Sequence, residues 1–231
     1  MERKRIYLSS PTMHGEEQAF VQSAFDTNWV APLGPNVDAF EKEMGDYIGG
    51  YAAALSAGTA AIHLAVILAG VKEGDVVFAQ SLTFAASVNP ACYEKAKPVF
   101  IDSEPDTWNM DPVALEKAFE KYPHPAAVIA VHLYGTPSKI DRIRDICKKH
   151  QVPLIEDAAE ALGSSFKGQK LGTFGDYGIL SFNGNKIIPS SGGGMLLCSD
   201  EAKIKRARFL ATQARDPARY YQHSTIGYNY R

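Results

Sequence analysis

A lysine at the end of an apolar strand carries the strongest chemical signal in this sequence. The run YGIL at 177–180 predicts a short buried strand, and it leads into the polar segment SFNGNK at 181–186. An amine held near a strand end can be kept partly desolvated, which makes Lys186 a candidate Schiff-base nucleophile. The alternative for Lys186 is a solvated surface charge, the usual state of lysine.

Three carboxylates lie at or just after the end of another predicted strand, at 153–156. Glu156 and Asp157 are adjacent, and Glu160 comes three positions after Asp157. Adjacent acids at the end of a buried strand are costly unless they bind a cation or accept hydrogen bonds. This pattern favours a functional role for the acidic segment.

Two further strand ends supply candidate binding groups. Gly58 and Thr59 follow the strand predicted at 52–55 and open a helix, whose N-terminal amides could bind a phosphate. The alternative is a plain glycine turn with Thr59 as the helix N-cap. Phe84 follows the strand predicted at 76–79, where a planar ring could stack on it, or it could simply belong to the core.

The elements that must position these residues form an alternating pattern from about residue 51. Strands are predicted at 52–55, 76–79, 98–101, 127–131, 153–156, 177–182 and 195–198, and helices at 15–27, 36–48, 59–70, 86–95, 112–121, 139–150 and 201–213. Asp111 and Ser138 are predicted to cap the helices that follow them. This order predicts an α/β fold with a mainly parallel mixed sheet between helices, in which ligands gather at the carboxyl ends of the strands.

The domain organisation predicted from the sequence is simple. Residues 1–50 form an N-terminal arm with helices, and residues 51–231 form one large α/β domain, because no long Pro- or Ser-rich linker divides the chain. Within the arm, Trp29 lies in an apolar loop broken by prolines and a glycine. It either contacts a ligand or packs the loop down.

The composition of the chain indicates which kinds of binding partner to expect. The chain has 231 residues, a formal net charge of −2 and a pI near 6.3, which give no electrostatic reason to expect nucleic acid or an anionic membrane. No signal-peptide h-region or membrane-length apolar run occurs, so a cytoplasmic location is expected. Cys92, Cys147 and Cys198 are predicted to be buried thiols in a reducing compartment, and no cysteine or histidine cluster predicts a metal.

Together these residues could form a pyridoxal phosphate site, with a lysine, an acid for the pyridine nitrogen, an aromatic ring and a phosphate cup. Five motifs occur in order: GTA at 58–60, TF at 83–84, EDAAE at 156–160, SFNGNK at 181–186 and GYNYR at 227–231. In these motifs the chain resembles the DegT/DnrJ/EryC1/StrS sugar-nucleotide aminotransferases, which are fold-type I pyridoxal phosphate enzymes. The resemblance covers nearly the whole chain.

The resemblance implies roles for individual residues. Lys186 would form the Schiff base and move a proton, and Asp157 would pair with the pyridine nitrogen. Glu160 stands where many relatives have His or Gln, and would lie near the cofactor ring. Cofactor binding is implied for Gly58, Thr59, Ala60, Phe84, Asp157, Glu160, Ser181, Asn183, Lys186 and Asn229, and substrate binding for Trp29 and Asn185.

The resemblance also implies a reaction and partners. The protein would transfer an amino group from L-glutamate, giving 2-oxoglutarate, to a nucleotide-linked keto-sugar, most like C4 of UDP-4-keto-6-deoxy-N-acetylglucosamine on the way to bacillosamine-type sugars. Amination at C3, a dTDP-keto-sugar substrate and an inactive truncated domain are the alternatives. Lys186 argues against the dehydratases of the group, which lack the lysine. A further alternative is a non-enzymatic binding module with a relic pocket. It would require one of Asp157, Ser181 or Lys186 to be missing, and all three are present.

An assembly is implied as well. Asn229 would reach the phosphate of a partner subunit, giving a homodimer with shared active sites, unless it is simply a turn residue. A smaller C-terminal domain would follow Arg231 in the family and is expected to be missing from this chain.

Overall fold

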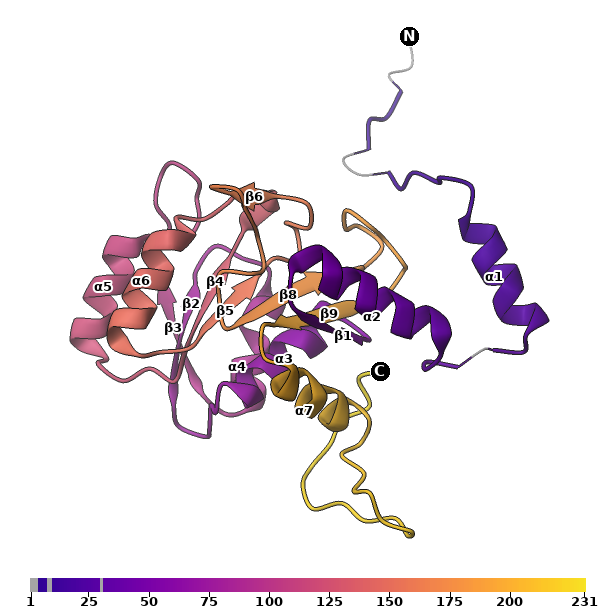
Figure 1. Cartoon of the computed structure of the whole chain (residues 1–231). Coiled ribbons are helices and arrows are strands. Elements are labelled where there is room, and N and C mark those ends of the chain that lie inside the picture. Colours follow the sequence, from indigo (N-terminus) through magenta and orange to yellow (C-terminus); the bar gives the residue numbers. More distant parts are fainter. Residues whose placement is uncertain (1–3, 8–9, 30) are drawn as a thin grey trace.

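A seven-stranded sheet forms the centre of the molecule, in a computed structural model that describes residues 4–7, 10–29 and 31–231 (Figure 1). Its strand order is β1-β9-β8-β5-β4-β2-β3, and β9 alone runs antiparallel to its neighbours. The strands are β1 (Tyr51–Leu55), β2 (Val76–Gln80), β3 (Lys97–Ile101), β4 (Ala127–Val131), β5 (Leu154–Asp157), β8 (Tyr177–Ser181) and β9 (Gly194–Cys198). The predicted mainly parallel mixed sheet is therefore confirmed, with every strand near its expected position.

Helices cover both faces of this sheet. They are α2 (Pro35–Ile48), α3 (Gly58–Leu68), α4 (Asn89–Tyr93), α5 (Pro112–Lys121), α6 (Ile140–His150) and α7 (Glu201–Ala211). Strand β4 shows how the two layers form, because Ile129 packs in the cluster beneath α3 and α7, whereas Val128 packs in the cluster beneath α5 and α6. A strand buried on both faces reads as a continuous apolar run, and this is the AVIAV sequence of β4.

The N-terminal segment contains helix α1 (Glu17–Asp26) and then α2. None of the residues of α1 is buried, and Figure 1 shows this helix standing away from the sheet. Helix α2 instead packs beside β1 and contributes Met44 to a core cluster. Among the described residues, no helix is long and apolar enough to cross a membrane.

Local sequence signals were accurate at some positions and wrong at others. Asp111 caps α5, accepting from the Val113 N–H at 2.9 Å, as predicted. Ser138 does not cap α6. The helix begins two residues later, and the Ser138 N–H donates to His132 Nδ1. The helix predicted at 86–95 is divided into a 3-10 turn, η1 (Ala85–Ser87), and α4, which starts anew at Asn89 beside a proline that cannot donate a backbone hydrogen bond.

Two further observations correct or extend the expectations. Cys147 and Cys198 are buried, but Cys92 is exposed, because it lies on the outer side of the one-turn helix α4. A small hairpin of β6 (Ser165–Phe166) and β7 (Gln169–Lys170) was not predicted, since its two-residue strands are too short to show periodicity.

The strand order brings the candidate site together. Strands β8, β5, β4 and β2 are adjacent and parallel, so their carboxyl ends meet at one edge of the sheet. Strand β1 is parallel to β8, because both are antiparallel to β9 between them. The segments that follow β1, β2, β5 and β8 therefore converge on one region.

Candidate active site

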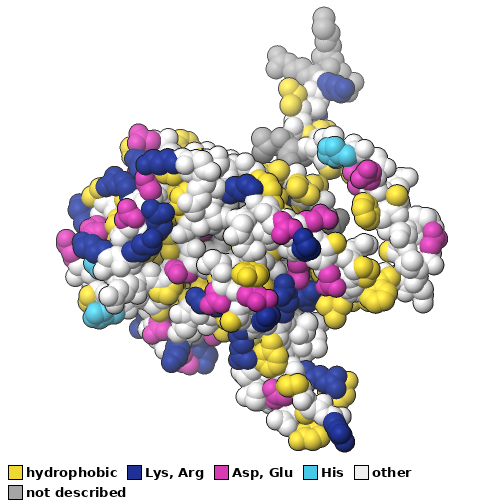
Figure 2. Space-filling model, viewed as in Figure 1, with side chains coloured by type: hydrophobic (Ala, Val, Ile, Leu, Met, Phe, Trp, Pro, Cys, Tyr) yellow, Lys and Arg dark blue, Asp and Glu magenta, His cyan; other side chains and the backbone are white. Residues whose placement is uncertain are grey.

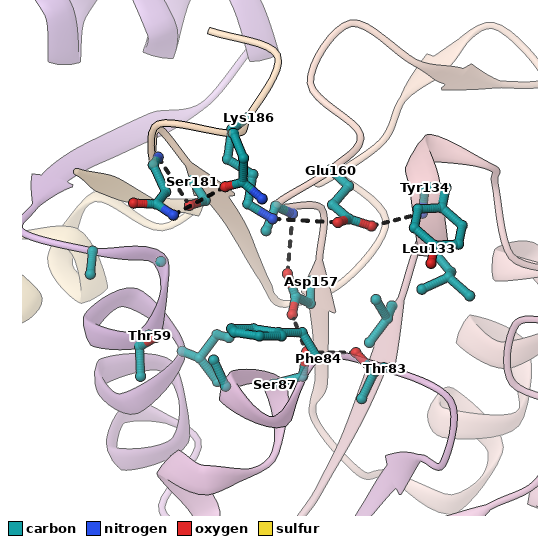
Figure 3. Close-up of a pocket in the computed structure, with 18 of the residues that line it drawn as sticks. Thr59, Thr83, Phe84, Ser87, Leu133, Tyr134, Asp157, Glu160, Ser181 and Lys186 are labelled. Atoms are coloured by element: carbon teal, nitrogen blue, oxygen red, sulfur yellow. Dashed lines mark hydrogen bonds and ion pairs between the residues drawn. The ribbon is translucent and has the colours of Figure 1, made fainter. Parts of the chain in front are cut away.

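The side chain of Lys186 lies in a cavity of about 650 Å³ at this edge of the sheet (Figure 3). The lysine lies in the loop after β8, and its side chain is only 14% exposed. Its amine lies 3.5 Å from Glu160 Oε1. Lys186 is thus a partly buried amine facing a cavity, and the solvated surface charge is ruled out.

Asp157 lines the same cavity (Figure 3). It is 4% exposed and accepts hydrogen bonds from Ser87 Oγ at 2.6 Å and from the Ala159 N–H at 3.1 Å. Burial raises the pKa of this carboxyl above its usual value, while the Ser87 hydrogen bond and the nearby charge of Lys186 act in the opposite direction. A cation entering the cavity would favour the ionised form.

Glu156, the adjacent acid, points to the opposite face of β5, because successive side chains of a strand alternate. It is fully buried and accepts from His132 Nε2 at 2.8 Å and from the N–H groups of Gly172 at 2.5 Å, Phe174 at 2.7 Å and Gly175 at 3.0 Å. His132 Nδ1 already accepts from the Ser138 N–H, so the ring donates to Glu156 through Nε2. Glu156 therefore stabilises the 172–175 loop and does not line the cavity.

A cradle for an anion forms where α3 begins. Gly58 and Thr59 line the cavity in the first turn of α3, where N–H groups have no intrahelical acceptor, and Ser181 lies beside them. A Cβ on Gly58 would come within 3.1 Å of Ser181 Cβ, so glycine permits this close approach. The N-cap of α3 is Ala57, so the N-cap alternative for Thr59 is wrong. Ala60 is buried and does not line the cavity, so its side chain is not available to a ligand there.

Phe84 stands in the cavity rather than in the core. Its side chain is 78% exposed, and in Figure 3 its ring lies between Thr59 and Asp157. The core alternative for Phe84 is therefore wrong. A planar ligand placed between Phe84 and Lys186 would present one face to this ring.

The remaining predicted residues divide into two groups. Glu160, Asn183 and Asn185 line the cavity, and Asn183 Nδ2 donates to Asn185 Oδ1 at 3.0 Å. Trp29 lies outside it, with its indole N–H donating to the Leu33 carbonyl. Asn229 also lies outside it, exposed, and accepts from Gln213 Nε2 at 3.1 Å.

The structure adds cavity residues that sequence reasoning missed. Ser87 donates to Asp157 and is itself within 2.8 Å of Thr83 Oγ1, but no sequence pattern links residues so far apart. Trp108 and Tyr134 line the cavity from two other loops. A tryptophan in the polar turn SEPDTWN was a signal that could have drawn attention to Trp108.

These residues fit pyridoxal phosphate. The cavity combines a partly buried amine, a buried carboxyl suited to a cationic ring nitrogen, an exposed aromatic ring and a helix N-terminus suited to phosphate. No group of three or more potential metal ligands occurs among the described residues. The fold and the site together assign the protein to the class of α/β proteins that bind pyridoxal phosphate.

Comparison with known proteins gives the family. Residues 11–231 match the DegT/DnrJ/EryC1/StrS aminotransferase family, and the chain belongs to it. It is 60% identical to a protein named "Putative pyridoxal phosphate-dependent aminotransferase EpsN" from Bacillus subtilis, covering 99% of this chain and 60% of that protein. It is 40% identical to a GDP-perosamine synthase from Caulobacter vibrioides, covering 98% of this chain and 61% of the relative.

Solved structures agree with the fold. A DegT DnrJ EryC1 StrS aminotransferase from Brucella abortus matches with a TM-score of 0.87 and 31% identity over 93% of this chain and 59% of its own. The putative sugar aminotransferase Spr1654 from Streptococcus pneumoniae, in its PLP form, matches with a TM-score of 0.89 and 26% identity over 97% of this chain and 62% of its own. The fold-type I prediction is confirmed, and pyridoxal phosphate is the cofactor these comparisons indicate. The chain spans about 60% of the length of the relatives it matches.

Proposed function

We propose that the protein transfers an amino group from L-glutamate to a nucleotide-linked keto-sugar, with pyridoxal phosphate as cofactor. The observation that carries this proposal is the meeting of Lys186 and Asp157, from the ends of neighbouring strands β8 and β5, in one cavity with the cradle of α3. When bound, the cofactor supplies an electron sink for the carbon that loses or gains a proton.

The residues of this chain would then have separate tasks. Lys186 supplies the amine that attaches the cofactor and afterwards moves the proton. Asp157 holds a proton on the ring nitrogen, and Ser87 fixes the orientation of that carboxyl through its 2.6 Å hydrogen bond. Phe84 covers one face of the ring and excludes water from it.

The phosphate and the flanking polar groups are positioned by other residues. The first-turn amides of α3, with Thr59 and Ser181, would hold the phosphate. Glu160, 3.5 Å from the amine of Lys186, would hold this amine in place beside the ring. Asn183 and Asn185 fix the loop before the lysine through the hydrogen bond between them.

For the substrate we propose C4 of UDP-4-keto-6-deoxy-N-acetylglucosamine. Amination at C4 is supported by a relative from Saccharopolyspora spinosa, 36% identical, named dTDP-4-dehydro-2,3,6-trideoxy-D-glucose 4-aminotransferase. The GDP-perosamine synthases make a GDP-sugar the main competing substrate. A C3 keto-sugar remains the second alternative.

A homodimer with shared sites is part of the proposal. Helix α1 has no buried residue and exposes Phe20, Val21 and Phe25, and Figure 2 shows hydrophobic side chains along this part of the chain. Such a face is stabilised when a second copy covers it. Asn229 lies outside its own chain's cavity, so its proposed phosphate contact would be made across the dimer.

One experiment tests the function and names the sugar. The purified protein is incubated with pyridoxal phosphate, L-glutamate and a panel of UDP-, GDP- and dTDP-linked 3-keto- and 4-keto-sugars, and 2-oxoglutarate is measured. Sustained formation with the UDP-linked 4-keto-sugar is expected. If only a GDP-linked sugar supports turnover, the proposed UDP-sugar substrate is wrong and the GDP-sugar replaces it. If no sugar gives 2-oxoglutarate, the aminotransferase proposal is overturned.

A further inference from the structure

Two exposed aromatic side chains lie at the cavity, in loops that the proposed chemistry does not use. Trp108 follows β3 and is 61% exposed, and Tyr134 follows β4 and is 78% exposed. Both have left-handed backbones, with φ of 61° and 54°. Side chains this bulky rarely adopt that conformation, and it persists only where the surroundings impose it.

A buried carboxylate imposes the conformation of Trp108. Glu104 is 3% exposed and accepts from the N–H groups of Asp106 and Thr107, each at 3.0 Å, and from Lys139 Nζ at 2.9 Å. The Trp108 N–H closes the turn by donating to the Glu104 carbonyl at 3.0 Å. The turn is therefore held from inside while the indole is left outside, facing the cavity.

Asn109 ties this turn to the loop of Tyr134. It is fully buried, accepts from the Leu133 N–H at 2.9 Å and donates to the Thr136 carbonyl at 3.0 Å. Asn109 and Leu133 directly adjoin the two aromatic residues in sequence. The two left-handed residues are thus fixed relative to each other by one buried amide.

The same unit reaches the reacting amine. The Tyr134 N–H donates to Glu160 Oε2 at 2.8 Å, and the other oxygen of that carboxylate lies 3.5 Å from Lys186 Nζ (Figure 3). A single carboxylate therefore separates the backbone of Tyr134 from the amine. A ligand portion that rests on Tyr134 would therefore lie close to the reacting amine, and Trp108 lines the same cavity.

We propose that Trp108 and Tyr134 form the binding surface for the pyranose ring of the keto-sugar, an inference that rests on the proposed aminotransferase function. A pyranose has C–H faces that pack on aromatic rings and hydroxyl groups at its edge that stay hydrated, and Trp and Tyr combine an apolar body with a polar edge. Tyr134 is linked to Lys186 through Glu160, and this closeness selects the sugar ring, which carries the reacting carbon, rather than the remote nucleobase.

Steady-state kinetics test the surface. Trp108→Ala and Tyr134→Ala should each raise the KM for the keto-sugar about tenfold, which corresponds to about 1.4 kcal/mol. The KM for L-glutamate should change much less, because glutamate has no pyranose face to lose. Phe100→Ala, at an aromatic residue that is 58% exposed on edge strand β3, is the matched control and should change neither. Equal effects on both KM values, or none on the sugar, would overturn the proposal.

A binding measurement gives a readout without turnover. The chain has two tryptophans, so Trp29→Phe leaves Trp108 as the sole indole. Its emission is followed with UDP-N-acetylglucosamine against UDP, GDP-mannose against GDP and dTDP-glucose against dTDP, none of which carries a ketone. At least one sugar-bearing compound should change the emission beyond its bare nucleotide. If every pair gives equal changes, Trp108 does not contact the sugar.

The two proposals can fail separately. L-Glutamate alone should yield about one equivalent of 2-oxoglutarate from cofactor-loaded protein, since this half of the reaction needs no sugar. If that product is absent, the aminotransferase function fails. If it forms while the variants keep a normal sugar KM, only the aromatic surface fails.

Discussion

At the residue scale, the chemistry depends on which face of β5 each acid occupies. Asp157 faces the cavity with two hydrogen bonds, and Glu156 faces the loop at 172–175 with four. The two carboxylates are adjacent in sequence, but successive side chains of a strand point to opposite faces. Asp157 therefore belongs to the candidate site, and Glu156 stabilises the loop at 172–175.

Replacing Asp157 by Asn should therefore slow the reaction more than it weakens cofactor binding. The amide keeps the shape but cannot hold a proton on the ring nitrogen by charge, so kcat should fall by about tenfold or more, equivalent to about 1.4 kcal/mol in the barrier. Steady-state rates and absorbance titration with pyridoxal phosphate measure the two quantities.

Glu156→Gln is the matched control for that experiment. Its NH₂ group cannot accept from the backbone N–H groups of the 172–175 loop, and an unsatisfied buried group costs about 1–3 kcal/mol. The variant should unfold at a lower temperature than Asp157→Asn. If kcat is unchanged in Asp157→Asn, Asp157 is not the acid that holds the proton on the ring nitrogen.

Lys186→Ala should abolish 2-oxoglutarate formation and leave part of the cofactor affinity. In the proposed binding mode, the cradle of Thr59, Ser181 and the α3 amides would hold the phosphate independently of the lysine. Equilibrium dialysis with pyridoxal phosphate measures the remaining affinity. Lys205→Ala, at an exposed lysine paired with Glu201 on α7, is the control and should retain full turnover.

At the scale of elements, the cradle depends on the contact between the start of β9 and the first turn of α3. A Cβ on Gly194 would overlap the backbone of Ala57 and Gly58. Gly194→Ala should therefore displace the start of α3, lower the unfolding temperature and weaken cofactor binding. Gly184→Ala, in the same stretch of chain with open space around it, should be neutral in both measurements.

The turn that presents Trp108 should give the molecule an acid-sensitive stability. Burial alone would raise the pKa of Glu104, but hydrogen bonds from Thr107, Lys139 and the Asp106 N–H lower it to about 2 from the ordinary 4.5. A lowered folded-state pKa means that the ionised group stabilises the fold above about pH 4.5, and that this stability is lost as the pH falls towards 2.

Thermal unfolding between pH 6 and pH 2 measures this contribution. In Glu104→Gln the unfolding temperature should already be lower near neutral pH, and it should fall less steeply on acidification than in the unmodified protein. Identical pH profiles for the two proteins would show that Glu104 does not act in this way.

At the scale of the whole molecule, the proposed dimer predicts that Asn229 acts in trans. A neutral amide donor to a phosphate is worth about 1.5–3 kcal/mol, so Asn229→Ala should weaken cofactor binding about tenfold or more. Mixing this variant with Lys186→Ala should restore activity at limiting cofactor. The mixed dimer then contains one intact cavity and one intact Asn229 that faces it. If activity is not restored after subunit exchange, Asn229 does not act in the cavity of the partner subunit.

The sequence by itself determined the layers of the molecule and the identity of the central residues. Short apolar runs located every strand of the large sheet, and interior strands such as β4 are apolar throughout because they are buried on both faces. Lys186, Asp157, Phe84 and Thr59 could be selected because each follows such a strand, and parallel strand ends meet at one edge.

Only the tertiary structure decided how the acids are divided and what surrounds the lysine. Strand register assigned Asp157 to the cavity and Glu156 to the 172–175 loop. Strand order, which periodicity does not encode, brought Ser87 to Asp157 and placed Tyr134 one carboxylate away from Lys186. Hydrogen bonds between residues far apart in the chain form only after the sheet is assembled, so no local pattern could predict them.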